Sequence, residues 1–485
     1  MWYETLLIGI YLAILCCLAL YGFHRTILVW LYYRHKRNRP EPKRLFSEEE
    51  LPIVTVQLPL FNEMYVAERL IESIAKLDYP RDRLEIQVLD DSTDETQGIC
   101  RKKVHQLRKR GYNIHYIHRD DRTGFKAGAL ENGLRHAKGE FAMVFDADFM
   151  PAPAMVRDMI HFFTDDQVGM VQARWGHVNR DYSRLTEVEA IMLDGHFVIE
   201  HTARHRSGRF FNFNGTAGMW RVKTISDAGG WQHDTLTEDM DLSYRAQLNG
   251  WDFIYLYDIV SPAELPVEMN SFKSQQFRWA KGSIQVALKL LPTIMRAKVP
   301  FRVKTEAFFH LTNNFAYPLL LLLSIFLLPN LLVRTHHGWR EVVLLDLPLF
   351  LGTTMSVISF YIVAQREVLP KGWRNRLKYL PLMLSVGIGL CINQTRAVLE
   401  ALLGKETEFV RTPKHGVSAK GENWTTKKYR AMKSLVPFFE IIMGLYFAVT
   451  LAVAFRGGHF LSMPFLLLFL VGYLYVGSLS VHQRR

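Results

Sequence analysis

The chain reads LEIQVLDDSTD at residues 84–94, a run of alternating apolar and polar residues that ends in carboxylates. This pattern predicts a strand whose carboxyl end carries an acidic turn. Strands alternating with helices predict an α/β fold with a parallel sheet, which binds ligands beyond the carboxyl ends of its strands. Further strands are predicted at 53–58, 114–117 and 141–145, and helices at 64–77, 96–110 and 125–136.

Acidic residues follow two of the predicted strands. Asp90 and Asp91 follow the second strand, where carboxylates can hydrogen-bond the base and ribose of a nucleotide, although such a sequence is also an ordinary turn. Asp146 and Asp148 follow the fourth strand, and the period of two along an extended chain turns both carboxylates to one side. Two such oxygen ligands suit Mg²⁺ or Mn²⁺ bound to a diphosphate, and a solvated acidic turn is the alternative.

Two predicted helix starts carry charged residues. Lys126 opens one helix beside small residues, and a helix N-terminus with a lysine suits phosphate oxygens, although a lone lysine there is more often only solvated. Thr237, Glu238 and Asp239 open another, where a carboxylate can be the base that deprotonates an acceptor hydroxyl. By spacing alone, an N-terminal cap with favourable helix-dipole charges is the favoured explanation of the second group.

An amphipathic helix is predicted at 271–298, with apolar residues interleaved with lysine and arginine. Such a helix can lie in a membrane interface. Within it, Trp279 offers a face on which a sugar can stack, and Gln275 and Arg278 are polar groups within reach of that sugar. The helix therefore has both a structural and a binding interpretation.

Long apolar segments flank the soluble part, and basic clusters next to them predict which side faces the cytoplasm. Much of the basic charge behind the net charge of +12 lies in these clusters, which indicates membrane lipids rather than nucleic acid as the partner. The four cysteines show no disulfide or metal-binding pattern. Five spans are predicted, and a sixth remains open. The predicted regions are an anchor at 1–32, a cytosolic domain at 51–267, an interface helix at 268–300 and a membrane region at 306–485. The membrane region is predicted to contain four spans, an interfacial or re-entrant helix at 380–403 and a loop at 405–433.

The motifs occur in the order Asp-Asp, Asp-x-Asp, Thr-Glu-Asp and Gln-x-x-Arg-Trp between membrane segments. In this order they resemble the processive family-2 glycosyltransferases, the cellulose, chitin and hyaluronan synthases. The strings at 87–94, 145–149, 171–175 and 213–218 look closest to the plant cellulose-synthase-like A and C groups and their bacterial relatives. The resemblance covers roughly residues 50–300 well and the membrane part loosely.

The resemblance implies a GT-A fold and a role for each motif. Asp90 or Asp91 would contact the nucleotide, Asp148 with Asp146 would bind the metal, and Asp239 in its Thr237-Glu238-Asp239 motif would be the catalytic base. Gln275, Arg278 and Trp279 would line the acceptor terminus and the diphosphate, and the segment with Gly215 and Thr216 would lie beside the acceptor. Residues 409–414 are similar to the loop that covers the nucleotide in cellulose synthase, so that Lys414 would meet phosphate, although Arg411 departs from the pattern.

The function implied is an inverting transferase that polymerises sugar from a nucleotide-diphosphate donor, GDP-mannose or UDP-glucose, into a β-1,4-linked mannan, glucomannan or glucan. The expected setting is an inner, plasma or Golgi-type membrane with the catalytic domain in the cytosol, a Mg²⁺ or Mn²⁺ cofactor and product translocation. Transfer of a single sugar to a lipid such as ceramide or diacylglycerol is the main alternative, and a transporter or non-catalytic scaffold is a minor one.

Overall fold

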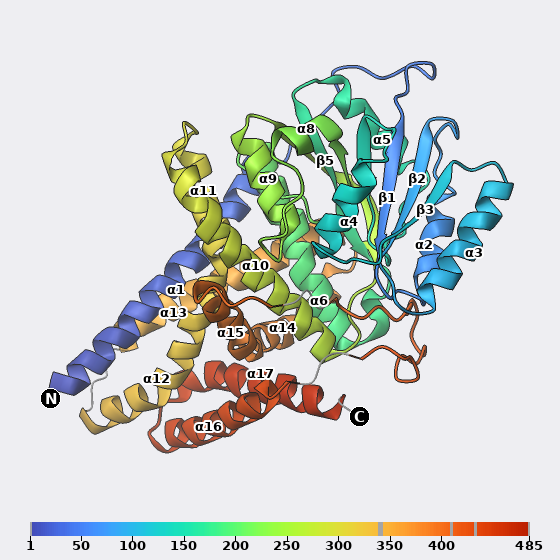
Figure 1. Cartoon of the computed structure of the whole chain (residues 1–485). Helices are drawn as coiled ribbons and strands as arrows, with labels where there is room; N and C mark the ends of the chain where they lie inside the picture. Colours follow the sequence, from blue (N-terminus) through green and yellow to red (C-terminus); the bar gives the residue numbers. More distant parts are fainter. Residues whose placement is uncertain (1, 338–342, 408–410, 431–433, 484–485) are drawn as a thin grey trace.

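The computed structural model describes residues 2–337, 343–407, 411–430 and 434–483, without the side chains of 336–347. Strands and helices alternate through the soluble part, as the sequence predicts, and all four predicted strands form (Figure 1). The strands are β1 (Val54–Leu60), β2 (Leu84–Asp90), β3 (Ile114–His118), β4 (Phe141–Val144), β5 (Val168–His177), β6 (Gly218–Arg221) and β7 (Asp252–Ala263). The helices around them are α2 (Ala67–Ile74), α3 (Thr96–Lys109), α4 (Phe125–Leu134), α5 (Met155–Ile160), α6 (Arg184–Asp194), α7 (His201–Arg206), α8 (Val222–Asp227) and α9 (Glu238–Leu248).

The sheet has the order β3-β2-β1-β4-β6-β5-β7 and is mixed. The parallel sheet that the sequence predicts covers β3, β2, β1 and β4, whereas β6 runs antiparallel to both β4 and β5. Gly218 at the start of β6 pairs with Val144 at the end of β4. Because an antiparallel strand begins where its neighbour ends, the segment before β6 lies at the carboxyl edge beside the acidic residues that follow β4.

Apolar side chains cover both faces of the sheet. The strands read as nearly continuous buried runs, which is typical of a sheet with helices on each side. One buried cluster packs β1, β2 and β4 against α2, α3 and α5, and a second joins α4, α9 and the β6 and β7 strands on the other face. The rigid sheet thus holds its carboxyl edge, where the motifs lie, in a defined geometry.

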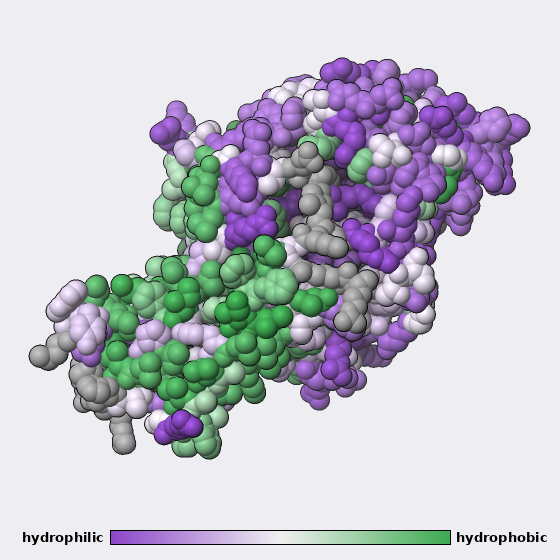
Figure 2. Space-filling model, turned by 60° about the horizontal axis from the view of Figure 1, so that its bottom comes forward, coloured by the Kyte–Doolittle hydropathy of each residue, from purple (hydrophilic) through white to green (hydrophobic). Residues whose placement is uncertain are grey.

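The apolar segments form a helical layer at one end of the molecule (Figures 1 and 2). Figure 2 shows hydrophobic residues over this end and hydrophilic residues over the sheet domain. The helices outside the sheet domain are α1 (Trp2–His35), α10 (Met269–Arg296), α11 (Phe301–Thr312), α12 (Ala316–His337), α13 (Val343–Val368), α14 (Leu380–Gly389), α15 (Cys391–Leu402), α16 (Val436–Arg456) and α17 (Met463–His482).

Five helices in the described ranges are long and apolar enough to cross a membrane: 2–35, 301–335, 348–368, 436–456 and 460–482. A further pair, 373–389 and 391–402, passes the same test only together and is bent by 41° between its halves. The segment predicted as one interfacial or re-entrant helix at 380–403 is therefore two helices, α14 and α15, that meet at Leu390. The geometry is compatible with a re-entrant segment and with a broken sixth span.

Polar residues on α15 contact α10. The amide of Asn393 donates to the carbonyl of Lys273 at 2.9 Å, and that of Gln394 donates to the carbonyl of Gln276 at 3.0 Å. Two buried ion pairs add to this contact, Lys281 with Glu400 at 3.2 Å and Lys273 with Glu440 of α16 at 2.7 Å. The polar side chains of α15 thus fix the helix that carries Gln275, Arg278 and Trp279.

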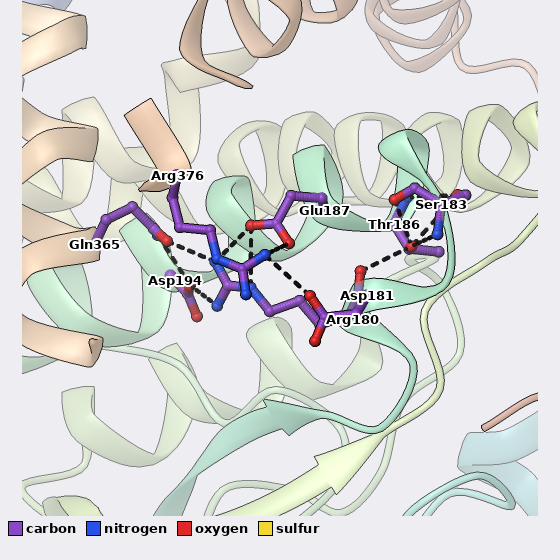
Figure 3. Close-up of polar contacts among 8 residues, drawn as sticks. All are labelled: Arg180, Asp181, Ser183, Thr186, Glu187, Asp194, Gln365 and Arg376. Atoms are coloured by element: carbon purple, nitrogen blue, oxygen red, sulfur yellow. Dashed lines mark hydrogen bonds and ion pairs between the residues drawn. The ribbon is translucent and has the colours of Figure 1, made fainter. Parts of the chain in front are cut away.

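A buried polar network joins the sheet domain to the membrane helices (Figure 3). Arg180, in the turn after β5, contacts Asp194 at 2.8 Å and Glu187 at 3.2 Å, both on α6. Gln365 of α13 donates to Asp194 at 2.9 Å, and Arg376, in the 3-10 helix before α14, pairs with Glu187. Because these charges are nearly excluded from water and paired, the network holds the two parts of the molecule in register.

Candidate active site

A cavity of about 170 Å³ lies at the carboxyl edge of the sheet. Its walls come from β4, the segment before β6, the start of α9, the helix α10 and the loop that follows α15. Segments far apart in the chain thus converge on one small space. The predicted site residues that line it are Asp91, Lys126, Asp146, Asp148, Gly215, Thr237, Glu238, Asp239, Gln275, Arg278, Trp279 and Lys414.

Asp146 and Asp148 follow β4 and face this cavity. Asp148 is almost fully buried, and one of its oxygens accepts from the backbone N–H of Glu264 at 3.0 Å and from Lys414 Nζ at 2.7 Å. Asp146 is half-buried, pairs with Lys126, and donates its backbone N–H to the Thr216 hydroxyl at 2.9 Å. Each carboxylate therefore has one lysine as its counter-charge.

The two aspartates provide a plausible but incomplete set of metal ligands. Across the described ranges, no group of three His, Cys, Asp or Glu side chains is arranged to hold a metal ion alone. Mg²⁺ and similar ions, however, are commonly bound through one or two carboxylates, with the remaining positions taken by substrate phosphates and water. Asp146 and Asp148 fit that kind of site, in which the ion enters together with a diphosphate.

Lys126 lies on the first turn of α4 between acidic residues. Its ammonium donates to the carbonyl of Gly215 at 2.9 Å as well as to Asp146. Burial alone lowers the pKa of Lys126, but the nearby carboxylates of Asp146 and Glu238 outweigh burial, so the net pKa is raised. A permanently charged ammonium is thus held within the cavity.

The two adjacent aspartates after β2 point in different directions. Asp90 is fully buried, where it accepts from Tyr116 of β3 at 2.7 Å and from the backbone of Ser92 at 3.0 Å. Asp91 lines the cavity and makes a two-point contact with Arg119 at 2.9 and 2.5 Å. Successive residues of a strand face opposite ways, so only Asp91 is brought to the cavity wall.

Asp239 lies in the first turn of α9, is partly buried and accepts the backbone N–H of Met240 at 2.8 Å. Burial, reinforced by the neighbouring charge of Glu238, raises the pKa of Asp239 to about 7. Thr237 precedes the helix without a side-chain capping bond. The cap explanation therefore fails for Thr237, and Asp239 has the pKa of an effective general base at neutral pH.

Gly215 allows two charged groups, Asp239 and Lys126, to come close to the backbone before β6. Its φ of +78° is a conformation that side chains rarely adopt, and an added Cβ would lie 3.0 Å from an Asp239 oxygen and 3.4 Å from Lys126 Nζ. Thr216 next to it is buried and accepts the Asp146 N–H bond. The segment before β6 thus ties the acidic pair after β4 to the start of α9.

Gln275, Arg278 and Trp279 lie on one face of α10 and close the cavity on the side of the membrane helices. The Trp279 ring lies 6.5 Å from that of Trp175 at the end of β5. Trp175 was not among the predicted site residues, although it belongs to the quoted string at 171–175. The two rings form an aromatic wall of the kind on which sugars stack.

The loop after α15 covers the open side of the cavity. Besides the bond of Lys414 to Asp148, Arg411 pairs with Glu63 at 3.2 Å, and Tyr429 donates to Asp94 at 2.5 Å. Phe409 and Val410 of the predicted motif lie outside the described residues. Arg411, which departs from the family pattern, lines the cavity as well.

A second cavity, of about 470 Å³, begins where the first one ends. Trp175, Asn214, Asp239, Gln275 and Trp279 line both cavities. The second one continues among helices α1, α12, α13, α14 and α17. A third cavity of about 100 Å³ lies beyond it and shares three lining rings with it, those of Phe350, Phe465 and Phe469.

Comparison with known proteins agrees with this geometry. Residues 52–282 match the family model described as glycosyltransferase like family 2. This range holds every motif from β1 to the Gln-x-x-Arg-Trp turn of α10. The match covers just under half of the chain, and the soluble part is similar to a family-2 glycosyltransferase domain.

Two curated relatives of the glycosyltransferase domain are plant enzymes. The chain is 40% identical over 294 residues to glucomannan 4-beta-mannosyltransferase 2 of Arabidopsis thaliana, covering 59% of this chain and 55% of that protein. It is also 40% identical over 264 residues to glucomannan 4-beta-mannosyltransferase 1 of Oryza sativa subsp. japonica, covering 53% and 51% respectively. The match thus spans just over half the length of each relative.

A solved structure supports the GT-A fold of the glycosyltransferase domain. The mannosyltransferase PcManGT from Pyrobaculum calidifontis, solved in complex with GDP-Man and Mn²⁺, matches with a TM-score of 0.54 at 21% identity. The match covers 82% of this chain and all of that one. This match confirms the GT-A fold that was predicted for the domain next to the membrane-type helices.

Proposed function

We propose that the chain is an inverting hexosyltransferase that extends a β-1,4-linked polysaccharide from a nucleotide-diphosphate sugar and passes the product across a membrane. The observation that carries this proposal is the junction of the two cavities at Asp239 and Trp279. On one side lies an acidic and basic cavity suited to a diphosphate. On the other side, the second cavity of about 470 Å³ continues between apolar helices.

GDP-mannose is the first donor to test, because the relatives in Arabidopsis and rice are named glucomannan 4-beta-mannosyltransferases. UDP-glucose and GDP-glucose are the next donors. We assign the nucleotide to the wall that contains Asp91, whereas Asp90 supports that wall from within through Tyr116. Lys126, Arg278 and Lys414 are cations on the cavity wall that can contact the diphosphate oxygens.

Asp148 and Asp146 would hold a divalent metal ion, Mg²⁺ or Mn²⁺. When bound, such an ion neutralises the charge that develops on the leaving diphosphate. Lys414 and Lys126 now neutralise the two carboxylates, so on donor binding both ammonium groups can turn from carboxylate to phosphate oxygens. The chain's own contribution is to hold the donor by its phosphates, with the anomeric carbon toward Asp239.

Asp239 is assigned as the base. Its carboxylate takes the proton of the acceptor hydroxyl as that oxygen forms a bond to the anomeric carbon, and the bond from that carbon to the phosphate oxygen breaks. Attack from the face opposite the leaving group inverts the anomeric configuration. Trp279 and Trp175 form the stacking wall for the terminal sugar of the acceptor, and Glu238 helps to keep the pKa of Asp239 high.

The second and third cavities are the proposed route of the product. They lead from Trp279 past Phe350, Phe465 and Phe469 toward the far ends of α12 and α16. Basic residues beside the spans, in the predicted loops before α14 and after α15, favour the cytosolic side for the glycosyltransferase domain. An inner, plasma or Golgi-type membrane fits this orientation.

Transfer of one sugar to a lipid remains the second candidate, and one observation favours it. The far part of the second cavity is lined by apolar side chains such as Leu15, Leu18, Leu323 and Phe469, which would also accommodate an acyl chain. The two candidates therefore share the donor site and differ in what lies beyond Trp279.

The purified chain should be incubated with Mn²⁺ or Mg²⁺ and, separately, GDP-mannose, GDP-glucose, UDP-glucose and UDP-N-acetylglucosamine. Sustained nucleoside diphosphate release, with a product that a β-1,4-mannanase or glucanase digests, supports the polysaccharide proposal and identifies the donor. Release only after addition of ceramide or diacylglycerol, with an organic-soluble product, would refute it in favour of the lipid candidate.

A further inference from the structure

The second cavity lies between two helical walls that each present a single face. On α6 and the π-helical turn after it, Glu189, Leu193, His196 and Glu200 line the cavity, with the spacing of one helix face. On α10 the lining residues run from Phe272 to Ser283 with the same periodicity. A π-helical turn inside a helix often occurs at a functional site.

Unsatisfied polar atoms lie on the α6 side of this cavity. Glu189 is 1% exposed, and neither carboxyl oxygen has a hydrogen-bond partner within the part of the chain that the structure describes. Asn212, in the segment before β6, is 4% exposed; its side-chain nitrogen donates to the carbonyl of Phe213, but its side-chain oxygen has no partner there. Buried polar groups are nearly always satisfied, so these atoms call for a ligand.

The chemistry of Glu189 restricts the ligand. Burial raises the pKa of Glu189 well above its ordinary value, although the charge of Lys414 opposes this. Burial thus favours the neutral carboxylic acid, which offers one O–H donor and acceptor oxygens. A sugar hydroxyl both donates and accepts and can therefore satisfy it, whereas an alkyl chain would leave both Glu189 and Asn212 unsatisfied.

We propose that Glu189 and Asn212 form a binding subsite for a sugar unit of the acceptor chain, behind the terminal sugar at Trp279. This subsite rests on the proposed function and makes it more specific, because it requires an acceptor that carries hydroxyl groups beyond the reacting unit. Glu189 acts there as a hydrogen-bonding group without charge. It fixes the chain between the α6 face and the α10 face so that the terminal hydroxyl stays near Asp239.

The test uses Glu189→Leu and Glu189→Gln in the full-length chain, with GDP-mannose as donor and β-1,4-linked manno-oligosaccharides of increasing length as acceptors. Glu189→Leu should raise the acceptor KM about 10- to 100-fold for longer oligosaccharides, which corresponds to about 1.4 to 2.8 kcal/mol. The effect should be small for mannobiose, and the donor KM should not change. Glu189→Gln keeps a donor and an acceptor and should stay within about threefold of the wild type.

Controls separate the possible failures. Glu41→Leu, on an exposed linker, is the matched surface substitution and should leave both KM values unchanged. If Glu189→Leu does not fold, as judged by its melting temperature and donor binding, Asn212→Ala provides the same test from the segment before β6. An unchanged acceptor KM in a folded variant overturns the subsite. A wild-type chain that transfers to no oligosaccharide from any donor refutes the proposed function instead.

Discussion

Replacing Asp239 by Asn should remove the base and leave donor binding intact. The pKa of Asp239 is raised from 3.8 to about 7, roughly three units, which corresponds to about 4 kcal/mol against its charged form. A base must be deprotonated to act, so kcat/KM of the wild type should rise with pH and level off above about 7. It should fall about tenfold for each unit below that value.

The assay is nucleoside diphosphate release at saturating acceptor, measured across pH in the wild type and the variant. The rate of Asp239→Asn should be about 10²- to 10⁴-fold lower than that of the wild type. Its residual rate should no longer fall as the pH drops below about 7. Asp234→Asn, an exposed aspartate close to the same helix, is the matched control and should retain the wild-type profile. Release by Asp239→Asn at the wild-type rate, with donor affinity preserved, would refute the assignment of the base.

The other predictions concern the metal, the covering loop and the supports of the site. Chelation with EDTA should abolish turnover and Mn²⁺ should restore it, whereas Asp148→Asn should require a much higher Mn²⁺ concentration; full activity in EDTA would contradict the proposed metal role. Lys414→Ala should raise the donor KM about tenfold or more, because charge-assisted hydrogen bonds contribute about 1.5–3 kcal/mol, and it should tighten Mn²⁺ binding to donor-free protein by freeing Asp148. An unchanged donor KM would show that Lys414 does not reach the phosphates. Lys273→Met should cost about 3–5 kcal/mol in the free energy of unfolding by removing the ammonium that pairs with the buried Glu440 carboxylate, and Glu440→Gln in the same chain should recover much of that loss in thermal melts. Asp194 has a lowered pKa because its pairing with His177 and Arg180 outweighs burial, so its contribution to stability should be present above about pH 4 and disappear as the pH falls through the lowered pKa, an effect that Asp194→Asn should abolish.

The walls of the second cavity come from more than the five candidate spans. The α10 helix and the bent pair α14 and α15 supply wall residues in addition to those of the spans. A passage from Asp239 toward the far side can therefore be lined by a single chain, provided that the rings of Phe350 and Phe465, whose centroids are 4.4 Å apart, can separate.

Local pattern alone predicted the strands that carry the acidic motifs and the start of each motif-bearing helix. The strand ending at Asp90 and the helix that begins at Phe125 follow from short-range periodicity, which acts over a few residues. The amphipathic helix predicted at 271–298 forms as α10 at 269–296 for the same reason. The strands β5, β6 and β7 were not predicted, and β6 is only four residues long and depends on β4 and β5 for its pairing.

By itself, the sequence determined that this protein has an α/β domain with a glycosyltransferase motif set between apolar segments, because periodicity, hydropathy and motif order are properties of the chain. Tertiary structure alone decided that Asp91 rather than Asp90 faces the cavity, and that Lys414 reaches Asp148 across 266 positions. It also decided that Glu189 is enclosed without a partner and that the pKa of Asp239 lies near 7. These properties depend on burial and on the distances between side chains, which packing sets and no local pattern encodes.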